Sequence, residues 1–177
     1  MAYFVTPLFS WLTLVANILL VLFICALVFR STFSDRVVMW VGKRALVLSW
    51  ILSMGGVVGS LLYSELVGYA PCVLCWIMRI LLYPQALLLG LGIWWRQTVI
   101  MPYMCALSLV GGLIALYHSY TQLGGRSLTP CTSQGGSCSK VFVLEFGYIT
   151  IPMMACTVFA LLVVVYVAYR RVSAQVS

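Results

Sequence analysis

Five apolar stretches, each about 20 residues long, constrain this chain more than any other feature of its sequence. They are Leu8–Phe29, Ala45–Leu66, Leu74–Trp95, Ile100–Tyr120 and Tyr148–Tyr169. An α-helix rises about 1.5 Å per residue, so roughly 20 residues cross a bilayer core about 30 Å thick. Hydrophobic residues make up 64% of the 177 residues and charged residues only 7%, a composition outside the range of soluble domains. The sequence therefore predicts an all-α membrane protein with five transmembrane helices.

The distribution of Lys and Arg predicts the orientation of these helices. Only Arg126 and Lys140 lie in connections on one side, whereas seven basic residues lie on the other. Those seven are Arg30, Arg36, Lys43, Arg44, Arg96, Arg170 and Arg171. Because cytoplasmic loops of membrane proteins are enriched in basic residues, we expect the seven to face the cytoplasm together with the C-terminus, and the N-terminus to lie outside. The same rule explains the net charge of +7, so the basic excess does not indicate nucleic-acid binding.

The five stretches suggest a division of the chain into two parts. Residues 45–177 are expected to form a bundle of four helices with an outer, cysteine-bearing loop at 119–147. Residues 1–44 are expected to add an N-terminal transmembrane helix and a basic cytoplasmic loop. No basic region precedes the first stretch, so we interpret it as a retained helix and not as a signal peptide.

Small residues inside two of the stretches predict close helix packing. Gly55 and Gly59 are spaced by four residues in the second stretch, and Gly111 and Gly112 are adjacent in the fourth. Glycines at such positions let helix backbones approach each other closely in a bilayer.

Cys72 and Cys75 form a Cys-x-x-Cys pair where the third stretch begins. The free N–H groups of a first helical turn favour a thiolate, so we expect Cys72, nearest the helix start, to be the more reactive thiol. As a structural disulfide the pair would constrain little of the unfolded chain. As half of a zinc site it would need two more ligands, which Cys131 and Cys138 would supply at an unusual spacing. A redox-active pair is the favoured interpretation.

Cys131 and Cys138 form a second pair in a loop rich in Gly and Ser. Alone, this pair fits a loop-closing disulfide as well as a redox role. Beside another pair on the same face, thiol–disulfide exchange becomes the better interpretation, since a thiolate attacks a disulfide through a mixed disulfide. The other three cysteines lie inside apolar stretches and are interpreted as small hydrophobic residues; they are Cys25, Cys105 and Cys156.

Two further side chains are candidates for a site near the Cys-x-x-Cys pair. Arg79 lies one helical turn beyond Cys75 on the same helix face. An arginine inside a membrane helix costs about 2.5–3.5 kcal/mol, so we favour a functional role over an anchor that reaches to the lipid headgroups. His118, the single histidine, should reach the level of Cys75 by helical rise. It is either an ordinary interfacial histidine or a group that hydrogen-bonds or protonates an electron acceptor.

Two cysteine pairs alone would equilibrate and stop, so sustained oxidation requires an electron acceptor. The sequence holds no haem-attachment motif, dinucleotide fingerprint or iron–sulfur run. A cation, a histidine and a reactive thiol beside lipid instead predict a membrane quinone, ubiquinone or menaquinone, and no metal. The competing hypothesis is a non-catalytic membrane protein, a transporter subunit or scaffold, with structural disulfides on its outer face.

Residues 60–155 resemble the DsbB/BdbC-type disulfide bond formation membrane proteins. The resemblance rests on Tyr63-Ser64-Glu65, the stretch from Pro71 to Pro84, His118, the loop cysteines, and Gly147 to Pro152. It implies a four-helix core to which the first stretch is an addition. It also implies a thiol:quinone oxidoreductase of the bacterial plasma (inner) membrane, which reoxidises a thioredoxin-like extracytoplasmic thiol oxidase of the DsbA/BdbD type.

The resemblance also implies a role for each cysteine. Cys131 would receive electrons from the partner protein, and Cys138 would resolve the mixed disulfide. Cys72 would exchange with the loop pair, while Cys75 would face the quinone with Arg79 beside it. Only six residues separate Cys131 and Cys138, which is closer to the BdbC branch of the family.

Overall fold

The computed structural model describes residues 2–29, 31–125 and 141–176, and this part of the chain is helical with short connections. The helices are α1 (Ala2–Val28), α2 (Thr32–Lys43), α3 (Ala45–Leu61), the π-helix η1 (Leu62–Leu66), α4 (Val73–Trp94), α5 (Met101–Gln122) and α6 (Ile151–Val176). Five helices among the described residues, counting α3 with η1 as one, are long and apolar enough to cross a membrane. The predicted all-α membrane fold is confirmed.

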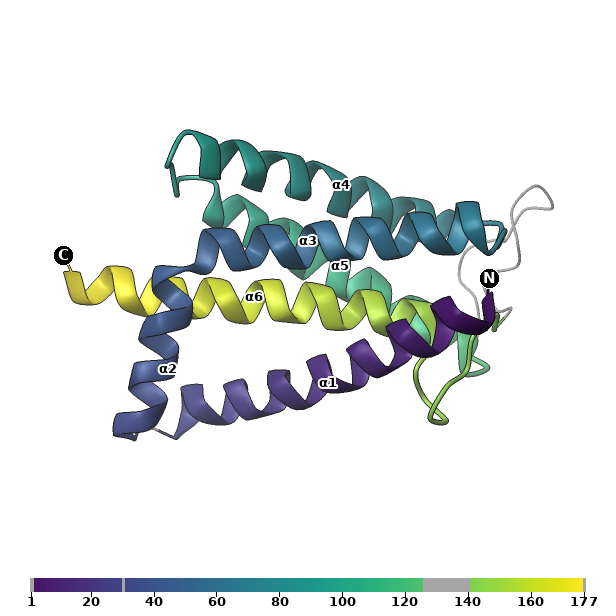
Figure 1. Cartoon of the computed structure of the whole chain (residues 1–177), viewed down its shortest axis with the longest axis horizontal. Coiled ribbons are helices and arrows are strands. Elements are labelled where there is room, and N and C mark those ends of the chain that lie inside the picture. The colour runs from purple at the N-terminus through teal and green to yellow at the C-terminus, as the bar shows by residue number, and fades with distance from the viewer. Residues whose placement is uncertain (1, 30, 126–140, 177) are drawn as a thin grey trace.

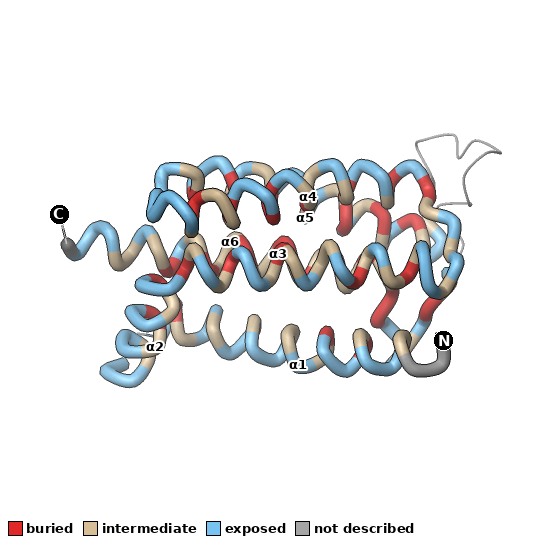
Figure 2. The backbone as a smooth tube through the Cα atoms, turned by 45° about the horizontal axis from the view of Figure 1, so that its top comes forward, coloured by how far each residue is buried: buried red, intermediate tan, exposed pale blue. Residues whose placement is uncertain are grey.

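Helices α3 to α6 form the predicted four-helix bundle. Helix α3 packs on α4, α4 on α5, α5 on α6, and α6 again on α3 (Figure 1). Phe159, Leu162, Met78, Leu82 and Ala115 form part of its core. Figure 2 shows buried residues on the inward faces of these helices and exposed ones outside. The exposed residues include many large apolar side chains, as expected of a surface that faces lipid.

Helix α1 is the additional N-terminal helix and lies outside this bundle, against α6 and α2 (Figure 1). The hydroxyl of Thr157 on α6 donates a 2.8 Å hydrogen bond to Oδ1 of Asn17 on α1. At the other end, Arg171 donates a 2.9 Å hydrogen bond to the carbonyl oxygen of Leu27. Polar bonds between membrane helices contribute about 1 kcal/mol each, so these two contacts help to hold α1 on the bundle.

Helix α2 corrects the prediction of a basic loop between the first two membrane helices. It lies across the end of the bundle, transverse to the long helices (Figure 1). Ser31 caps its start by accepting a 3.2 Å hydrogen bond from the backbone N–H of Ser34, while Asp35 and Lys43 suit the two ends of the helix dipole. The segment is too short and too polar to span a membrane, but its cap and buried Val38 mark an amphipathic helix.

The two ends of the bundle differ in charge. Helix α2, the connection from α4 to α5 and the end of α6 share one end, and α4 begins at the other (Figure 1). The basic residues of the first end are Arg36, Lys43, Arg44, Arg96, Arg170 and Arg171. Arg30, Arg126 and Lys140 lie outside the described residues. The grouping of the described basic residues agrees with the sequence analysis, and the side of the membrane stays a prediction.

Helix α6 begins three residues later than the apolar stretch Tyr148–Tyr169 suggested. Glu145 and Ile149 exchange backbone hydrogen bonds of 3.0 and 2.9 Å, which hold the chain between them in a turn. Phe146 and Gly147 have positive φ angles of 51° and 76°, and such angles are incompatible with a right-handed helix. The helix therefore starts at Ile151 and runs on to Val176.

The glycines predicted to allow close packing behave differently from one another. A Cβ atom added to Gly111 would lie 2.5 Å from the ring of Phe159, so α5 and α6 are closely packed there. A Cβ added to Gly59 would lie 2.9 Å from the ring of Phe9 on α1. Gly55 is different, because an added Cβ would meet nothing within 4 Å. The prediction of close packing is confirmed at Gly111 and Gly59 and wrong at Gly55.

We predict that Gly111→Ala lowers the free energy of unfolding by about 1–3 kcal/mol, because the new methyl group overlaps the ring of Phe159. Gly112→Ala is the matched control, since its Cβ would lie 3.7 Å from Cβ of Phe159, an ordinary contact. Ala is the better helix former, so the control should match the original protein or exceed its stability. Thermal unfolding of both variants in detergent measures the difference, and equal melting temperatures would contradict the prediction.

Candidate functional site

A cavity of about 410 Å³ lies at the end of the bundle where α4 begins. Residues from α1, α3, η1, α4, α5 and α6 line it, and most of their side chains are apolar. Four residues singled out in the sequence are brought together in this lining: Cys72, Cys75, Arg79 and His118. Small-molecule sites in proteins have this size and this mainly apolar character with a few polar groups. The cavity is therefore the candidate functional site.

The Cys-x-x-Cys pair forms the first turn of α4. Cys72 is the N-cap residue, and its sulfur accepts a 3.4 Å hydrogen bond from the backbone N–H of Cys75. The sulfurs of the two cysteines lie 3.2 Å apart. Cys72 is buried, with 5% of its surface exposed, whereas Cys75 is partly exposed. Two thiols in such contact can form a disulfide with a small movement.

His118 on α5 reaches the cysteine pair, as the helical rise predicted. Its Nε2 atom lies 3.6 Å from the sulfur of Cys72, and only 1% of the residue is exposed. Its Nδ1 atom is buried and has no hydrogen-bond partner among the described residues. An imidazole in contact with a thiol can exchange a proton with it, so the arrangement suits a base that serves Cys72. An ordinary interfacial histidine would instead be solvated.

The same three residues are also a possible ligand set for a metal ion. A sulfur of Cys72, a sulfur of Cys75 and a ring nitrogen of His118 all lie within 4.8 Å of one another. Thiolate and imidazole are the usual ligands of Zn²⁺, and structural zinc sites have four of them. The zinc site that the sequence left open as an alternative would have Cys131 and Cys138 as its other ligands, and both lie outside the described residues. The structure instead brings His118, separated from Cys75 by 42 residues of the chain, to the cysteine pair.

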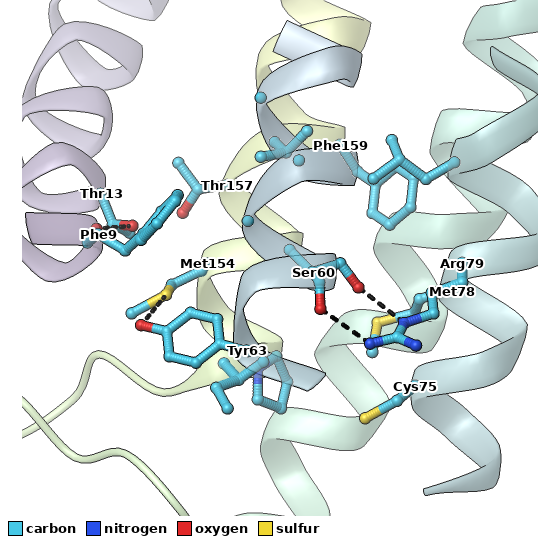
Figure 3. A pocket seen from close by; sticks show the side chains of 18 of the residues that line it. Phe9, Thr13, Ser60, Tyr63, Cys75, Met78, Arg79, Met154, Thr157 and Phe159 are labelled. Atoms are coloured by element: carbon cyan, nitrogen blue, oxygen red, sulfur yellow. Dashed lines mark hydrogen bonds between the residues drawn. The ribbon is translucent and has the colours of Figure 1, made fainter. Parts of the chain in front are cut away.

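Arg79 is held inside the bundle by Ser60 at the end of α3. Its Nε donates a 2.7 Å hydrogen bond to the hydroxyl of Ser60, and an amino nitrogen donates a 2.9 Å bond to the Ser60 carbonyl oxygen. The guanidinium also lies 5.3 Å from the ring centre of Trp76, a cation–π distance. Figure 3 shows Arg79 pointing from α4 toward α3, with Cys75 on the adjoining turn. This orientation argues against an anchor that reaches for the lipid headgroups.

Ser60 is the functional candidate that sequence reasoning missed. It precedes Arg79 by 19 residues and lies just before the π-helix η1. No rule of local spacing pairs two residues on different helices. The one available signal was the cost of an arginine inside a membrane helix, which demands a polar partner.

The pKa of the Cys72 thiol is raised to about 11, opposite to the sequence prediction. The largest cause is the hydrogen bond with Cys75, and burial adds to it. The contact with His118 and the backbone N–H of Cys75 lower the pKa, but by less. The prediction of a readily ionised Cys72 is wrong for the dithiol state, because it considered the helix start and neither burial nor the neighbouring sulfur.

The remaining cysteines lie away from the site or outside the described residues. Cys131 and Cys138, the predicted second pair, belong to the stretch that the structure does not describe. Cys25, Cys105 and Cys156 lie on α1, α5 and α6 as free thiols, and none of the three lines the cavity. Their positions agree with the interpretation as small hydrophobic residues.

Comparison with known families identifies the architecture. The family model described as "Disulfide bond formation protein DsbB" matches residues 43–169. The chain belongs to the DsbB family. It is therefore a multi-pass bacterial membrane protein of disulfide bond formation, an oxidoreductase role that the cysteine pair at the start of α4 fits. Helix α1 and nearly all of α2 lie outside the residues that match the DsbB model.

Curated DsbB-family relatives cover the same part of the chain. Disulfide bond formation protein C of Bacillus subtilis is 36% identical over 118 residues, which are 66% of this chain and 85% of that protein. The SPbeta prophage-derived disulfide bond formation protein B of the same organism is 38% identical over 120 residues, 68% of this chain and 81% of that protein. A probable disulfide formation protein of Metapseudomonas resinovorans is 29% identical over 128 residues, 71% of this chain and 89% of that protein. No solved structure is significantly similar to this chain.

We predict that the alkylation rate of Cys72 in the reduced protein keeps rising about tenfold per pH unit up to about pH 10, because its pKa is about 11. Cys75→Ala should shift this profile to lower pH by removing the largest cause of the raised pKa. His118→Leu should shift it to higher pH, since the contact with His118 favours the thiolate. Mass spectrometry that resolves each cysteine measures the profiles, and a plateau below pH 8 in the original protein would contradict the prediction.

Proposed function

We propose that this protein is a thiol:quinone oxidoreductase. It reoxidises a thioredoxin-like thiol oxidase outside the cytoplasm and passes the electrons through two cysteine pairs to a membrane quinone. The observation that carries the proposal is the convergence of Cys72, Cys75, His118 and Arg79 on one apolar cavity at the end of a membrane bundle. Membership of the DsbB family supports the same activity.

The cavity fits a quinone in size, polarity and charge. A volume of about 410 Å³ suits an aromatic ring, and the lining is mainly apolar. Among the described residues that line the cavity, Arg79 is the only charged side chain. Its bonds to Ser60 use Nε and one amino nitrogen, so the other amino nitrogen can donate to an acceptor oxygen. A bound quinone would be the final acceptor of the two electrons and two protons that are released when Cys72 and Cys75 form their disulfide.

The protein's own residues manage the thiols and their protons. A disulfide between Cys72 and Cys75 is reduced when a thiolate of the loop pair attacks the Cys72 sulfur, which leaves Cys75 as the departing thiolate. The dithiol state has a Cys72 that holds its proton at neutral pH, so reoxidation needs a base beside it. His118 lies 3.6 Å from that sulfur and takes this role. Arg79 favours negative charge at the cavity end of the pair.

The partner and the loop pair enter the proposal through the resemblance and the relatives. A thiolate of the reduced thioredoxin-like protein attacks Cys131 and displaces Cys138 as a thiolate, and the second cysteine of the partner resolves the mixed disulfide and leaves the partner oxidised. The pair then exchanges with Cys72 at the start of α4. Per cycle one partner dithiol becomes a disulfide, so two electrons and two protons pass along the route. The site end of the bundle faces outward in the bacterial plasma membrane, as the basic residues of the opposite end indicate.

The test is quinone reduction by the purified protein with a reduced thioredoxin-like donor. The original protein should form quinol, and Arg79→Met should lower the rate or raise KM on the order of 10- to 100-fold, because a charged hydrogen bond is worth about 1.5–3 kcal/mol. Arg79→Lys should recover part of this loss, since an ammonium keeps the charge but lacks the planar fork. Unchanged kinetics in Arg79→Met would show that the arginine takes no part in quinone reduction.

Two controls separate catalysis from folding in this assay. The amount of trapped disulfide between the loop pair and Cys72 should be the same in Arg79→Met as in the original protein, because thiol exchange does not need the cation. Cys75→Ser should form no quinol at all while it still accumulates the mixed disulfide. A protein whose two cysteine pairs stay oxidised in the presence of reduced donor would instead be a scaffold.

We predict that a membrane-impermeant thiol reagent labels Cys131 and Cys138 in intact, reductant-treated cells. This expectation follows from the basic residues at the opposite end of the bundle, which favour the cytoplasmic side. Cys25 on α1 is the internal control, since it lies within a membrane-spanning helix. Labelling of the loop pair only after the membrane is broken would reverse the proposed orientation.

A further inference from the structure

Helix α1 lies outside the residues that match the DsbB model, yet it forms one wall of the cavity. Phe9, Leu12, Thr13 and Ala16 all line the cavity. Their spacing places them on one face of α1 over about two turns. Figure 3 shows Phe9 and Thr13 across the cavity from Arg79 and Cys75. The cavity is thus shared between the family core and a helix that this chain adds to it.

Contacts at both α3 and α6 fix the position of this wall. The ring of Phe9 lies over Gly59, and its centroid is 5.8 Å from that of Tyr63 on η1. Asn17, the residue after Ala16, accepts the hydrogen bond from Thr157, and Thr157 also lines the cavity. The wall is therefore held at its outer end by aromatic packing and deeper in the bilayer by a polar bond.

Between these two contacts the lining includes several small residues. Gly55 lies one turn deeper than Gly59 on α3, and a Cβ added there would meet nothing within 4 Å. Gly55 lines the cavity, as do Gly56 beside it and Ala16 on the facing helix. Gly55 is itself exposed, so the space beside it is open to the surrounding lipid. The cavity therefore has a lateral opening at Gly55, through which an apolar chain can reach the bilayer.

We propose that this strip between α1 and α3, lined by Thr13, Ala16, Gly55 and Gly56, binds the apolar tail of the quinone acceptor. The inference rests on the proposed function and adds a tail-binding role for α1. Arg79 and Cys75 occupy the polar part of the cavity, which suits a ring with two carbonyl oxygens. The apolar strip suits a linear hydrocarbon chain, which gains van der Waals contacts with the residues on both sides. Helix α1 thereby sets the preference for tailed over tailless quinones.

Two substitutions on opposite walls test the strip. Gly55→Leu fills it from α3 without meeting protein atoms at Cβ, and Ala16→Leu fills it from α1. Ala26→Leu is the matched control, because it makes the same change on the same helix at a partly exposed position that does not line the cavity. All variants are made in a Cys72→Ser, Cys75→Ser background, so that equilibrium binding is measured without thiol chemistry. Quenching of tryptophan fluorescence reports binding of a short-tailed ubiquinone and of the tailless menadione.

Gly55→Leu and Ala16→Leu should each weaken binding of the tailed quinone about tenfold or more, which corresponds to about 1.4 kcal/mol. Each should change the affinity for menadione by less than about twofold. Ala26→Leu should leave both affinities unchanged. The tail-binding role would be overturned if the variants weakened the binding of both quinones equally, or if neither variant weakened the binding of the tailed quinone. Either result would leave the proposed function standing. Absence of any quinone binding to the background protein would overturn both. The two variants lie on different helices, so a folding defect in one leaves the other to decide.

Discussion

Lipid cannot form hydrogen bonds, and most of this structure depends on that constraint. Every backbone polar group in the bilayer must be satisfied within its own helix, so the chain folds into long helices joined by short turns. Polar side chains inside the bilayer then need partners on neighbouring helices. Arg79 finds Ser60, Thr157 finds Asn17, and Gln85 accepts a hydrogen bond from Ser108. These bonds fix which helices are neighbours, a choice that apolar contact with lipid would leave open.

The same lack of water determines the chemistry of the cysteine pair. A thiolate at Cys72 would be buried against another sulfur, and the raised pKa expresses the free-energy cost of that charge. His118 is the polar neighbour that offsets part of this cost. Because the pKa of Cys72 is raised, this thiol keeps its proton at neutral pH and reacts slowly with other thiols and with water-soluble electrophiles.

The sequence predicted the features that depend on local pattern and missed those that depend on contact between helices. The five spans follow from length and hydrophobicity, and the boundaries of Ala45–Leu66 agree residue for residue. Helical rise predicted that His118 lies at the membrane level of Cys75, and helical periodicity predicted that Arg79 lies on the same helix face as Cys75. The partner of Arg79 and the open space at Gly55 could not be predicted, because each depends on the position of another helix. The raised pKa of Cys72 was missed because its main causes are the hydrogen bond with Cys75 and burial in the folded bundle. Helix α2 is a different case, because its cap and its amphipathic pattern are present in the sequence and it could have been predicted from them.

The position of α2 has a mechanical consequence for the cavity. Helix α1 is joined covalently to the rest of the bundle only through α2, at the end far from the cysteines (Figure 1). At the cavity end, the seam between α1 and α3 is closed by the ring of Phe9 over Gly59, with no peptide link across it. Helix α2 is therefore positioned as a hinge between α1 and α3, and the cavity lies at the end opposite this hinge. The cavity-side ends of α1 and α3 can part toward lipid only if the ring of Phe9 leaves Gly59 and Tyr63 and the ring of Trp11 leaves Phe146, whereas the four-helix core that carries the thiols can stay packed.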